Sequence, residues 1–196
     1  MVKKVLATLF IVLLVLVLVV LAVASTRPSD FKVERQASLP APPATVFPLV
    51  NDLGRWPQWS PWEKLDPNMK RTISEPSSGT GATYAWTGNN QVGEGVMTIV
   101  SSEPNARVGL RLDFVKPWAS TSQTVVDIAP SDAGSQVTWT MTGKHDLMSK
   151  VMCLFVDMDK MMGKDFESGL ANLGTVAAQS PAPADTLSAP ADTLAR

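Results

Sequence analysis

The strongest constraint on this fold is a helical pattern in the stretch from His145 to Val176. Apolar residues recur there at steps of three or four, and charged residues fall mostly on the other side of the implied helix. Asp146 suits an N-cap, because its carboxylate can accept from the first free backbone N–H groups. Gly163 is unfavourable inside a helix, so we expect a bend or break within Phe155–Gly163. A long helix with one apolar face needs a partner surface.

A second constraint is the uncharged apolar run from Val5 to Ala24, which Lys3 and Lys4 precede. A helix of about 20 residues spans about 30 Å, the thickness of a bilayer's hydrocarbon core. Residues 1–24 are therefore either a transmembrane signal anchor or a signal peptide. Cleavage would fall near Ala24, where small residues alternate. The run is longer than a usual signal core, which favours the anchor.

The charges around this run bear on its orientation. A short tail with two lysines usually stays in the cytoplasm, although Arg27, Lys32 and Arg35 on the other flank leave the orientation open. We expect a single-pass protein of a bacterial-type inner membrane with its domain extracytoplasmic. The alternative is a protein secreted after cleavage.

The residues between these two segments predict mainly strands. After a polar linker at 25–30, residues 31–39 alternate apolar and polar side chains, as a half-buried strand does. Prolines then lead into a short helix over 44–53. Six further strands are expected, separated by turn residues, at 69–75, 81–88, 92–102, 106–116, 120–129 and 135–144. Consecutive strands with short connections favour an antiparallel meander.

The predicted strands have one apolar and one polar face. The apolar face carries Tyr84, Trp86, Val108, Leu110, Leu112, Phe114, Val137, Trp139 and Met141. The opposite face carries Arg107, Arg111, Asp113, Thr138 and Thr140. The C-terminal helix can cover the apolar face, which predicts an α+β domain with a sheet of about seven strands.

Composition limits the possible functions. The net charge is −1, charged residues make up 18% of the chain, and no basic run follows the first four residues, which argues against nucleic-acid binding. Cys153 is the single cysteine, so an internal disulfide and a thiolate metal cluster are excluded. Residues 177–196 are rich in Ala and Pro and contain Pro-Ala-Asp-Thr-Leu twice, which predicts a disordered tail. Residues 31–176 remain as one folded domain.

Two local motifs carry a resemblance to a known family. Residues 52–63 read Asp-Leu-Gly-Arg-Trp-Pro-Gln-Trp-Ser-Pro-Trp-Glu, and residues 159–173 form the end of the helical pattern. With the order of elements over 31–176, they resemble the polyketide cyclase/dehydrase-like proteins of the SRPBCC superfamily, which includes START domains and the birch-pollen allergen family. The resemblance implies a helix-grip fold, in which a curved sheet wraps the C-terminal helix and leaves a cavity between them. Members bind or transform very different apolar molecules, so the function stays open.

The sequence contains no motif of a catalytic centre, metal site or phosphate-binding loop, and we predict no catalytic residue, metal or cofactor. His145 and Cys153 are a conceivable nucleophilic pair, but a turn histidine and an inert buried thiol are the favoured interpretation. Asp157, Asp159 and Asp165 neighbour Lys160 and Lys164 in the sequence and are interpreted as a solvated helix face.

The predicted cavity is lined by methionine and aromatic side chains. Six of the nine methionines fall between Met141 and Met162, and methionine adapts to irregular apolar shapes. Trp56, Trp59 and Trp62 either pack the turn onto the sheet, which we favour, or line the cavity mouth. The cavity candidates are Trp59, Tyr84, Trp86, Leu112, Phe114, Trp139, Met141, Met152, Phe155, Met162 and Phe166.

The leading hypothesis is a membrane-tethered binding module for a hydrophobic or amphipathic small molecule, lipid-like or aromatic. Its partners are that ligand and the membrane; no nucleic acid is expected, and the oligomeric state is left open. One alternative is an enzyme of cyclase or hydrolase type that uses the same cavity, with one or two polar groups moving protons; His145, Glu94 and Asp113 are the residues to substitute as a test. Glu94, Arg111 and Asp113 could be polar groups of the site, and the direction in which they face is left open. The other is an envelope protein-interaction domain with a filled core and no ligand.

Overall fold

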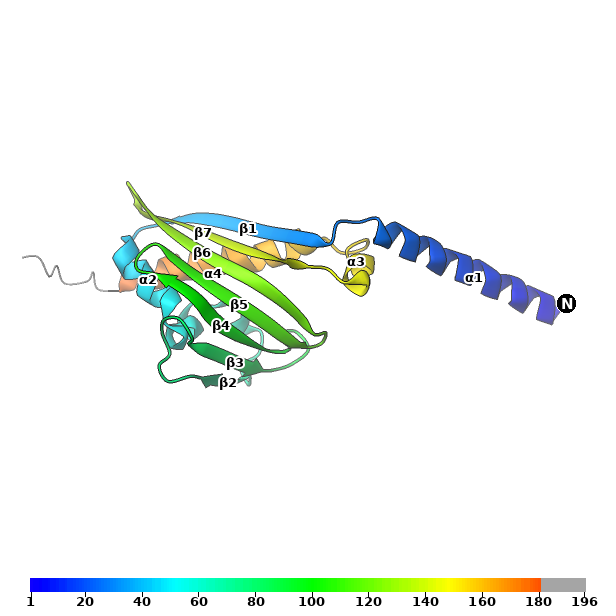
Figure 1. The fold of residues 1–196 in the computed structure, drawn as a ribbon, viewed down its shortest axis with the longest axis horizontal. Coiled ribbons are helices and arrows are strands. Elements are labelled where there is room, and N and C mark those ends of the chain that lie inside the picture. Colours follow the sequence, from blue (N-terminus) through cyan, green and yellow to red (C-terminus); the bar gives the residue numbers. More distant parts are fainter. Residues whose placement is uncertain (181–196) are drawn as a thin grey trace, which may run out of the picture.

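The computed structural model describes residues 1–180 and has an α+β architecture (Figure 1). The α-helices are α1 Val2–Ser25, α2 Pro43–Asn51, α3 Leu147–Met152 and α4 Met158–Gln179, and the 3-10 helices are η1 Leu53–Gln58 and η2 Pro61–Lys64. The strands are β1 Asp30–Leu39, β2 Lys70–Ile73, β3 Thr83–Thr87, β4 Glu94–Glu103, β5 Arg107–Lys116, β6 Ser120–Ser131 and β7 Gly134–Lys144. α4 continues past the predicted domain end at residue 176, and the predicted tail from residue 181 onward lies outside the described residues.

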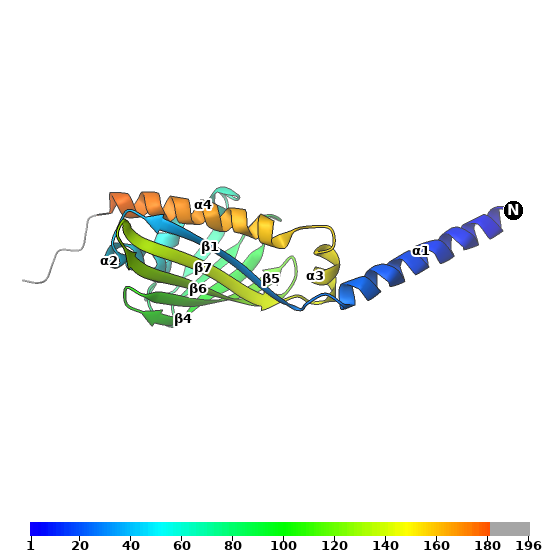
Figure 2. The same ribbon diagram turned by 90° about the horizontal axis from the view of Figure 1, so that it is seen from above.

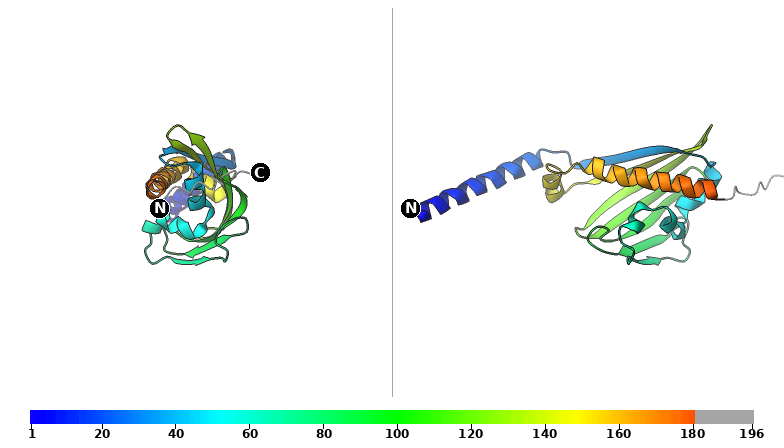
Figure 3. Two further views of the ribbon diagram at one scale, coloured as in Figure 1. Left: turned by 90° about the vertical axis from the view of Figure 1, so that its left-hand side faces the viewer. Right: turned by 180° about the vertical axis from the view of Figure 1, so that it is seen from behind.

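The strands form one antiparallel sheet in the order β1-β7-β6-β5-β4-β3-β2. The meander from β2 to β7 is confirmed, and β1 extends it by pairing with β7. β5 illustrates the predicted faces, because Leu110 is buried on the inner side and Arg111 is exposed on the outer side. The sheet curves around α4, as the end-on view in Figure 3 shows. This confirms the helix-grip fold.

The C-terminal helical pattern is interrupted, as expected, but Gly163 does not cause the interruption. The chain leaves the helix between α3 and α4, and α4 restarts where the Asp157 side chain accepts from the backbone N–H of Lys160 at 2.9 Å. Gly163 lies inside α4, where an added Cβ would collide with the guanidinium of Arg35. The glycine therefore leaves room for the Arg35 side chain of β1 against α4.

The apolar core fills one half of the space between the sheet and α4. Phe166, Leu170 and Leu173 of α4 are fully buried there. They pack with α2, the tryptophans that follow it and the inner face of the sheet. Arg35 adds ion pairs to Glu167 and Asp159 on the other side of α4, although exposed pairs of this kind contribute only about 0–1 kcal/mol each. The other half of this space, toward α3, is less completely filled.

α1 extends away from the domain as a single helix (Figure 2). It is long and apolar enough to cross a membrane by length and composition. Ala24 is its only buried residue, and its contacts with the domain are made to α3. The linker is tied down where the backbone N–H of His145 donates to the Ser29 carbonyl at 2.7 Å. α3 and the incompletely filled half of the domain therefore lie at the end from which α1 emerges.

Candidate ligand cavity

Two adjoining cavities occupy the space between the sheet and the helices at the end near α1. The first, the α3 cavity, measures about 630 Å³ and the second, the Trp139 cavity, about 370 Å³. The residues that line both are Phe114, Lys116, Pro117, Met141, Met158 and Met162. Because they share this wall, the two cavities are compartments of one region. This region lies between the sheet and the helices, where the resemblance to helix-grip proteins predicted a cavity.

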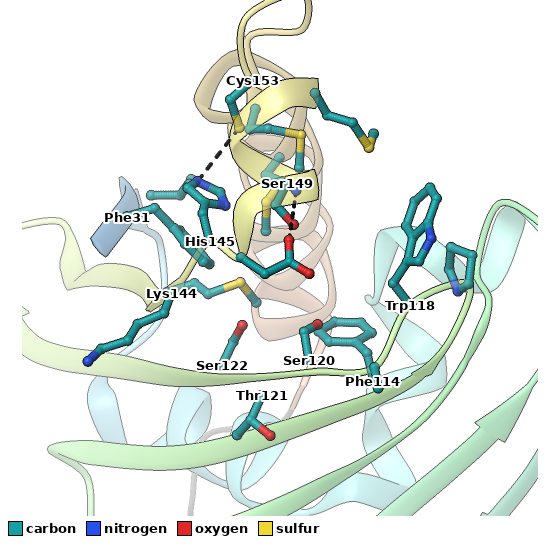
Figure 4. A pocket seen from close by; sticks show the side chains of 18 of the residues that line it. Phe31, Phe114, Trp118, Ser120, Thr121, Ser122, Lys144, His145, Ser149 and Cys153 are labelled. Carbon is teal, nitrogen blue, oxygen red and sulfur yellow. Dashed lines mark hydrogen bonds between the residues drawn. The ribbon is translucent and has the colours of Figure 1, made fainter. Parts of the chain in front are cut away.

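The α3 cavity is built from strand ends and from the short helix that faces them (Figure 4). Trp118, in the turn between β5 and β6, lies across the cavity from Ser149 of α3. Asp146 caps α3 as predicted, because its side chain accepts from the backbone N–H of Ser149 at 2.7 Å. His145 stacks on Phe31, with ring centroids 4.7 Å apart. The cap and the stacking hold α3 over this end of the sheet.

The Trp139 cavity lies deeper against the sheet and is mainly apolar. Its walls come from η2, the inner faces of β3 to β7 and the first turns of α4. The main apolar side chains are Trp56, Trp62, Met69, Tyr84, Trp86, Met97, Leu112, Phe114, Trp139, Met141, Met161 and Met162. Such a lining, with few polar groups, is typical of small-molecule sites.

A satisfied polar cluster lies at one wall of this cavity. The Tyr84 hydroxyl donates to Glu63 Oε1 at 2.6 Å, and Arg71 pairs with the other oxygen of the same carboxylate at 2.9 Å. Burial, together with this carboxylate, raises the pKa of the Tyr84 phenol, so the ring stays neutral. Because each group already has a partner, the cluster fixes the wall and leaves little hydrogen-bonding capacity for a ligand.

Two other polar groups in the Trp139 cavity have no partner among the described residues. Thr124 Oγ1 and Trp139 Nε1 are both buried, with each residue 2% exposed, and neither makes a hydrogen bond. Thr124 lies opposite Met141 in the β6–β7 register, and Trp139 is the next inward-facing residue of β7. A buried polar group without a partner costs about 1–3 kcal/mol. Both residues line the compartment, but these two atoms have almost no accessible surface, so a ligand atom can reach them only when neighbouring side chains move.

Trp139 is held in place by aromatic neighbours rather than by hydrogen bonds. It stacks on Phe166 with centroids 4.4 Å apart and meets Trp59 edge-on at 5.5 Å. Gly169 of α4 allows this approach, because a Cβ there would lie 2.8 Å from Trp139 Cζ3. Trp56 and Trp59 donate their indole N–H groups to backbone carbonyls of α2. These contacts agree with the favoured interpretation of Trp59 as a packing residue, whereas Trp56 and Trp62 also line the Trp139 cavity.

The structure places most, but not all, of the predicted cavity residues at the cavities. Those that line one or both are Tyr84, Trp86, Leu112, Phe114, Trp139, Met141, Met152 and Met162. Trp59 and Phe166 line neither, because both are fully buried in the core beside Trp139. Phe155 lines neither because it falls in the break between α3 and α4 and is 76% exposed. Ligand binding by the remaining residues stays a prediction.

The structure brings His145 and Cys153 together, with Nε2 and Sγ 3.7 Å apart (Figure 4). Both line the α3 cavity. However, partial burial raises the pKa of the Cys153 thiol, whereas a nucleophilic cysteine needs its pKa lowered. The contact therefore has the geometry of a pair without the electrostatics of an activated thiolate.

The expected polar groups of the site lie elsewhere. Arg111 pairs with Asp113 on the outer face of the sheet at 2.7 Å, because both have the outward phase of β5. Glu94 pairs with Lys116 where β4 begins and β5 ends. None of these three residues lines either cavity, and the outward position of Arg111 and Asp113 agrees with the polar face predicted from the strand alternation.

The interpretation of three aspartates as a solvated face is confirmed for two of them and wrong for Asp165. Asp157 is exposed at the N-cap of α4, and Asp159 is exposed and pairs with Arg35. Asp165 is half-buried and lines the Trp139 cavity. Its burial raises the pKa of its carboxyl group, although the Trp62 indole acts in the opposite direction. A helical charge pattern cannot reveal which turn faces a cavity rather than solvent.

The raised pKa of Asp165 gives a pH-dependent prediction. Since the folded protein holds this proton more tightly than the unfolded chain, Asp165 lowers stability as pH rises from about 3.9 through the folded pKa. Asp165→Asn is therefore expected to raise the melting temperature at pH 7 and to lose that advantage near pH 4. Thermal unfolding at both pH values measures this. Asp132→Asn, in the exposed β6–β7 turn, is the control, and an equal effect at both pH values would contradict the account.

Several cavity residues escaped the sequence-based prediction. Thr124 is the clearest, since it occupies an inward position of β6 between the buried residues Ser122 and Val126. A polar residue in the apolar phase of a strand is a signal that the sequence does contain. Trp118 and Glu63 lie in a turn and a 3-10 helix, where no periodicity indicates which way a side chain points.

The model of the family described as polyketide cyclase/dehydrase and lipid transport matches residues 30–178. Comparison with curated proteins gives no significant match.

Solved structures with the same fold are distant in sequence. A protein from Rhizobium leguminosarum is 16% identical with a TM-score of 0.58, covering 79% of this chain and 98% of that one. The Aha1 dimer from Colwellia psychrerythraea is 14% identical with a TM-score of 0.55, covering 75% and 96%. Ara h 8.0201 is 12% identical with a TM-score of 0.53, covering 77% and 99%. At these identities the likeness establishes the fold alone.

Proposed function

The chain belongs to the polyketide cyclase/dehydrase and lipid transport family, and from this premise we propose that it is a membrane-tethered binding module for a hydrophobic or amphipathic small molecule. The observation that carries the proposal is the apolar region between the sheet and the helices, with compartments of about 630 and 370 Å³. Known small-molecule sites have volumes of about 300–1,000 Å³. A close-packed interior has few voids larger than a water molecule, so a space of this size is room that a ligand could fill.

The polar groups in the cavity favour an amphipathic ligand over a pure hydrocarbon. Thr124 and Trp139 each have a donor without a partner among the described residues, in a mainly apolar compartment. An uncharged hydroxyl or carbonyl oxygen would satisfy them once a small shift of neighbouring side chains exposes these atoms. A carboxylate is disfavoured, because the carboxyl groups of Glu63 and Asp165 line the same compartment and its lysine, Lys116, is already paired with Glu94. The proposed ligand therefore carries a neutral oxygen at its inner end and an apolar body that extends into the α3 cavity.

Thr124→Val tests this orientation. Valine keeps the shape of threonine but removes the hydroxyl, so the ligand-free protein should be as stable as before or more stable. Binding of an amphipathic ligand should weaken about fivefold, since one hydrogen bond is worth about 1 kcal/mol. Titration with a long-chain alcohol measures both effects when combined with thermal unfolding. Thr138→Val, on the outer face of β7, should leave binding unchanged; unchanged binding in Thr124→Val would contradict the orientation.

The membrane part of the proposal rests on α1. Its 24 residues are long and apolar enough to span a bilayer. We propose that α1 is an uncleaved anchor in a bacterial-type inner membrane and that the domain lies outside the cytoplasm. The alternative is secretion after cleavage near Ala24. Protease accessibility of the domain in intact spheroplasts tests the topology, and the mass of the mature chain tests the cleavage.

A thermal-shift panel tests the binding function. A ligand at 100 times its Kd stabilises a protein by about 2.7 kcal/mol, which is readily seen in the melting temperature. The panel contains long-chain alcohols, monoacylglycerols, phospholipids and polycyclic aromatic compounds. We expect stabilisation by members that combine an apolar body with a neutral oxygen. Absence of any shift across the panel would instead favour a domain without a ligand.

A further inference from the structure

The end of the domain that carries the cavity mouth also carries exposed apolar side chains. Trp118, in the β5–β6 turn, is 60% exposed, and Met148 of α3 is 60% exposed. We define the α3 rim by its exposed apolar members, which are Trp118, Leu147, Met148, Met152, Phe155 and Val156. Exposed apolar side chains gathered at one end of a domain indicate an interaction surface. Trp118 and Met152 also line the α3 cavity, so the rim borders its mouth.

The position of α1 identifies what this rim contacts. α1 packs against α3, and its residue Ala24 is fully buried. The linker from Thr26 to Ser29 can span at most about 14 Å, given about 3.6 Å per extended residue, and β1 begins directly after it. The hydrogen bond from the His145 backbone N–H to the Ser29 carbonyl joins the linker to the chain between β7 and α3. If α1 spans a bilayer, α3 is therefore held where the helix leaves it.

We propose that the α3 rim is inserted in the interface of the same bilayer that α1 spans, so that the α3 cavity opens onto the membrane. Tryptophan and phenylalanine favour this interfacial layer, and short amphipathic helices lie in its plane. A lipid-like ligand can then pass between the bilayer and the cavity along apolar surface instead of through water, where each exposed CH₂ costs about 0.8 kcal/mol. The inference rests on the proposed anchor function of α1 and deepens it.

The test uses the full chain in phosphatidylcholine nanodiscs, with spin labels on single cysteines. Cys153→Ser removes the native thiol, and Met148→Cys places the label on the rim. Val100→Cys is the matched control. Val100 is also exposed, but it lies toward the Glu103 end of β4, away from the α3 rim. Leu14→Cys labels α1 itself. Power saturation with oxygen and with a water-soluble nickel complex reports whether each label lies in lipid or in water.

We expect the labels at positions 148 and 14 to be more accessible to oxygen than to the nickel complex. The label at position 100 should be more accessible to the nickel complex than to oxygen. Trp118→Glu should shift the label at position 148 toward nickel accessibility without moving the label at position 14. A water-exposed label at 148 with a lipid-exposed label at 14 would overturn the docking while leaving the anchor intact. A water-exposed label at 14 would overturn the anchor, and the docking with it.

Discussion

Replacing Phe166 by alanine is expected to lower the free energy of unfolding by about 3–5 kcal/mol, the usual cost of removing a fully buried phenylalanine. The ring is completely buried and stacks on Trp139 at 4.4 Å. α4 has few other large apolar residues at this level, so the surrounding side chains cannot close the space. Urea unfolding of the domain without α1, residues 26–180, measures the loss in free energy of unfolding.

Phe155→Ala is the matched control for this prediction. Both phenylalanines belong to the same apolar pattern in the sequence, but Phe155 is 76% exposed. Its removal should change stability by no more than about 0.5 kcal/mol. A loss below about 1 kcal/mol for Phe166→Ala, or similar losses for both variants, would mean that α4 does not pack on Trp139 as described.

Enlarging Leu112 to tryptophan is expected to abolish ligand binding with little cost in stability. Leu112 lies on the inner face of β5 and lines the Trp139 cavity. In a close-packed core, added side-chain volume costs about 1–3 kcal/mol. Where a cavity receives the new ring, that penalty is avoided and the ligand is displaced instead. The combination of retained stability and lost binding therefore distinguishes a cavity from a filled core.

Arg111→Trp controls for the introduction of a large aromatic residue on the same strand. Arg111 faces outward and pairs with Asp113, so its replacement should leave the cavity and its ligand unaffected. Thermal unfolding and a ligand titration on both variants measure the result. Destabilisation of Leu112→Trp by several kcal/mol, with binding by the parent protein absent, would favour the filled-core alternative.

The fold could be predicted from sequence because its signals are periodic. The alternation along β5 separates Leu110 from Arg111, and the same alternation holds across the meander. The spacing within α4 likewise places Phe166 and Leu170 on the buried face. Periodicity reports the direction of a side chain, and direction suffices to assemble a sheet and the helix that covers it.

Depth and local breaks could not be predicted in the same way. Trp59 and Phe166 point inward as expected, but they lie in the filled half of the interior. Which half is filled depends on how α2 packs. Phe155 keeps the helical spacing, yet the Asp157 cap restarts the helix after it. Trp118 reaches the cavity from a turn. Each of these placements depends on contacts between elements that are distant in sequence.

Native mass spectrometry of residues 26–180, purified from cells without detergent, tests the central claim most directly. The account predicts a discrete added mass that is lost on denaturation and that is absent from Leu112→Trp but present in Arg111→Trp. Extraction would then give the ligand's chemistry, with a neutral oxygen on an apolar body expected. A bare mass for the parent protein, together with no stabilisation by the lipid and aromatic panel, would contradict the account and favour an interaction domain with a closed core.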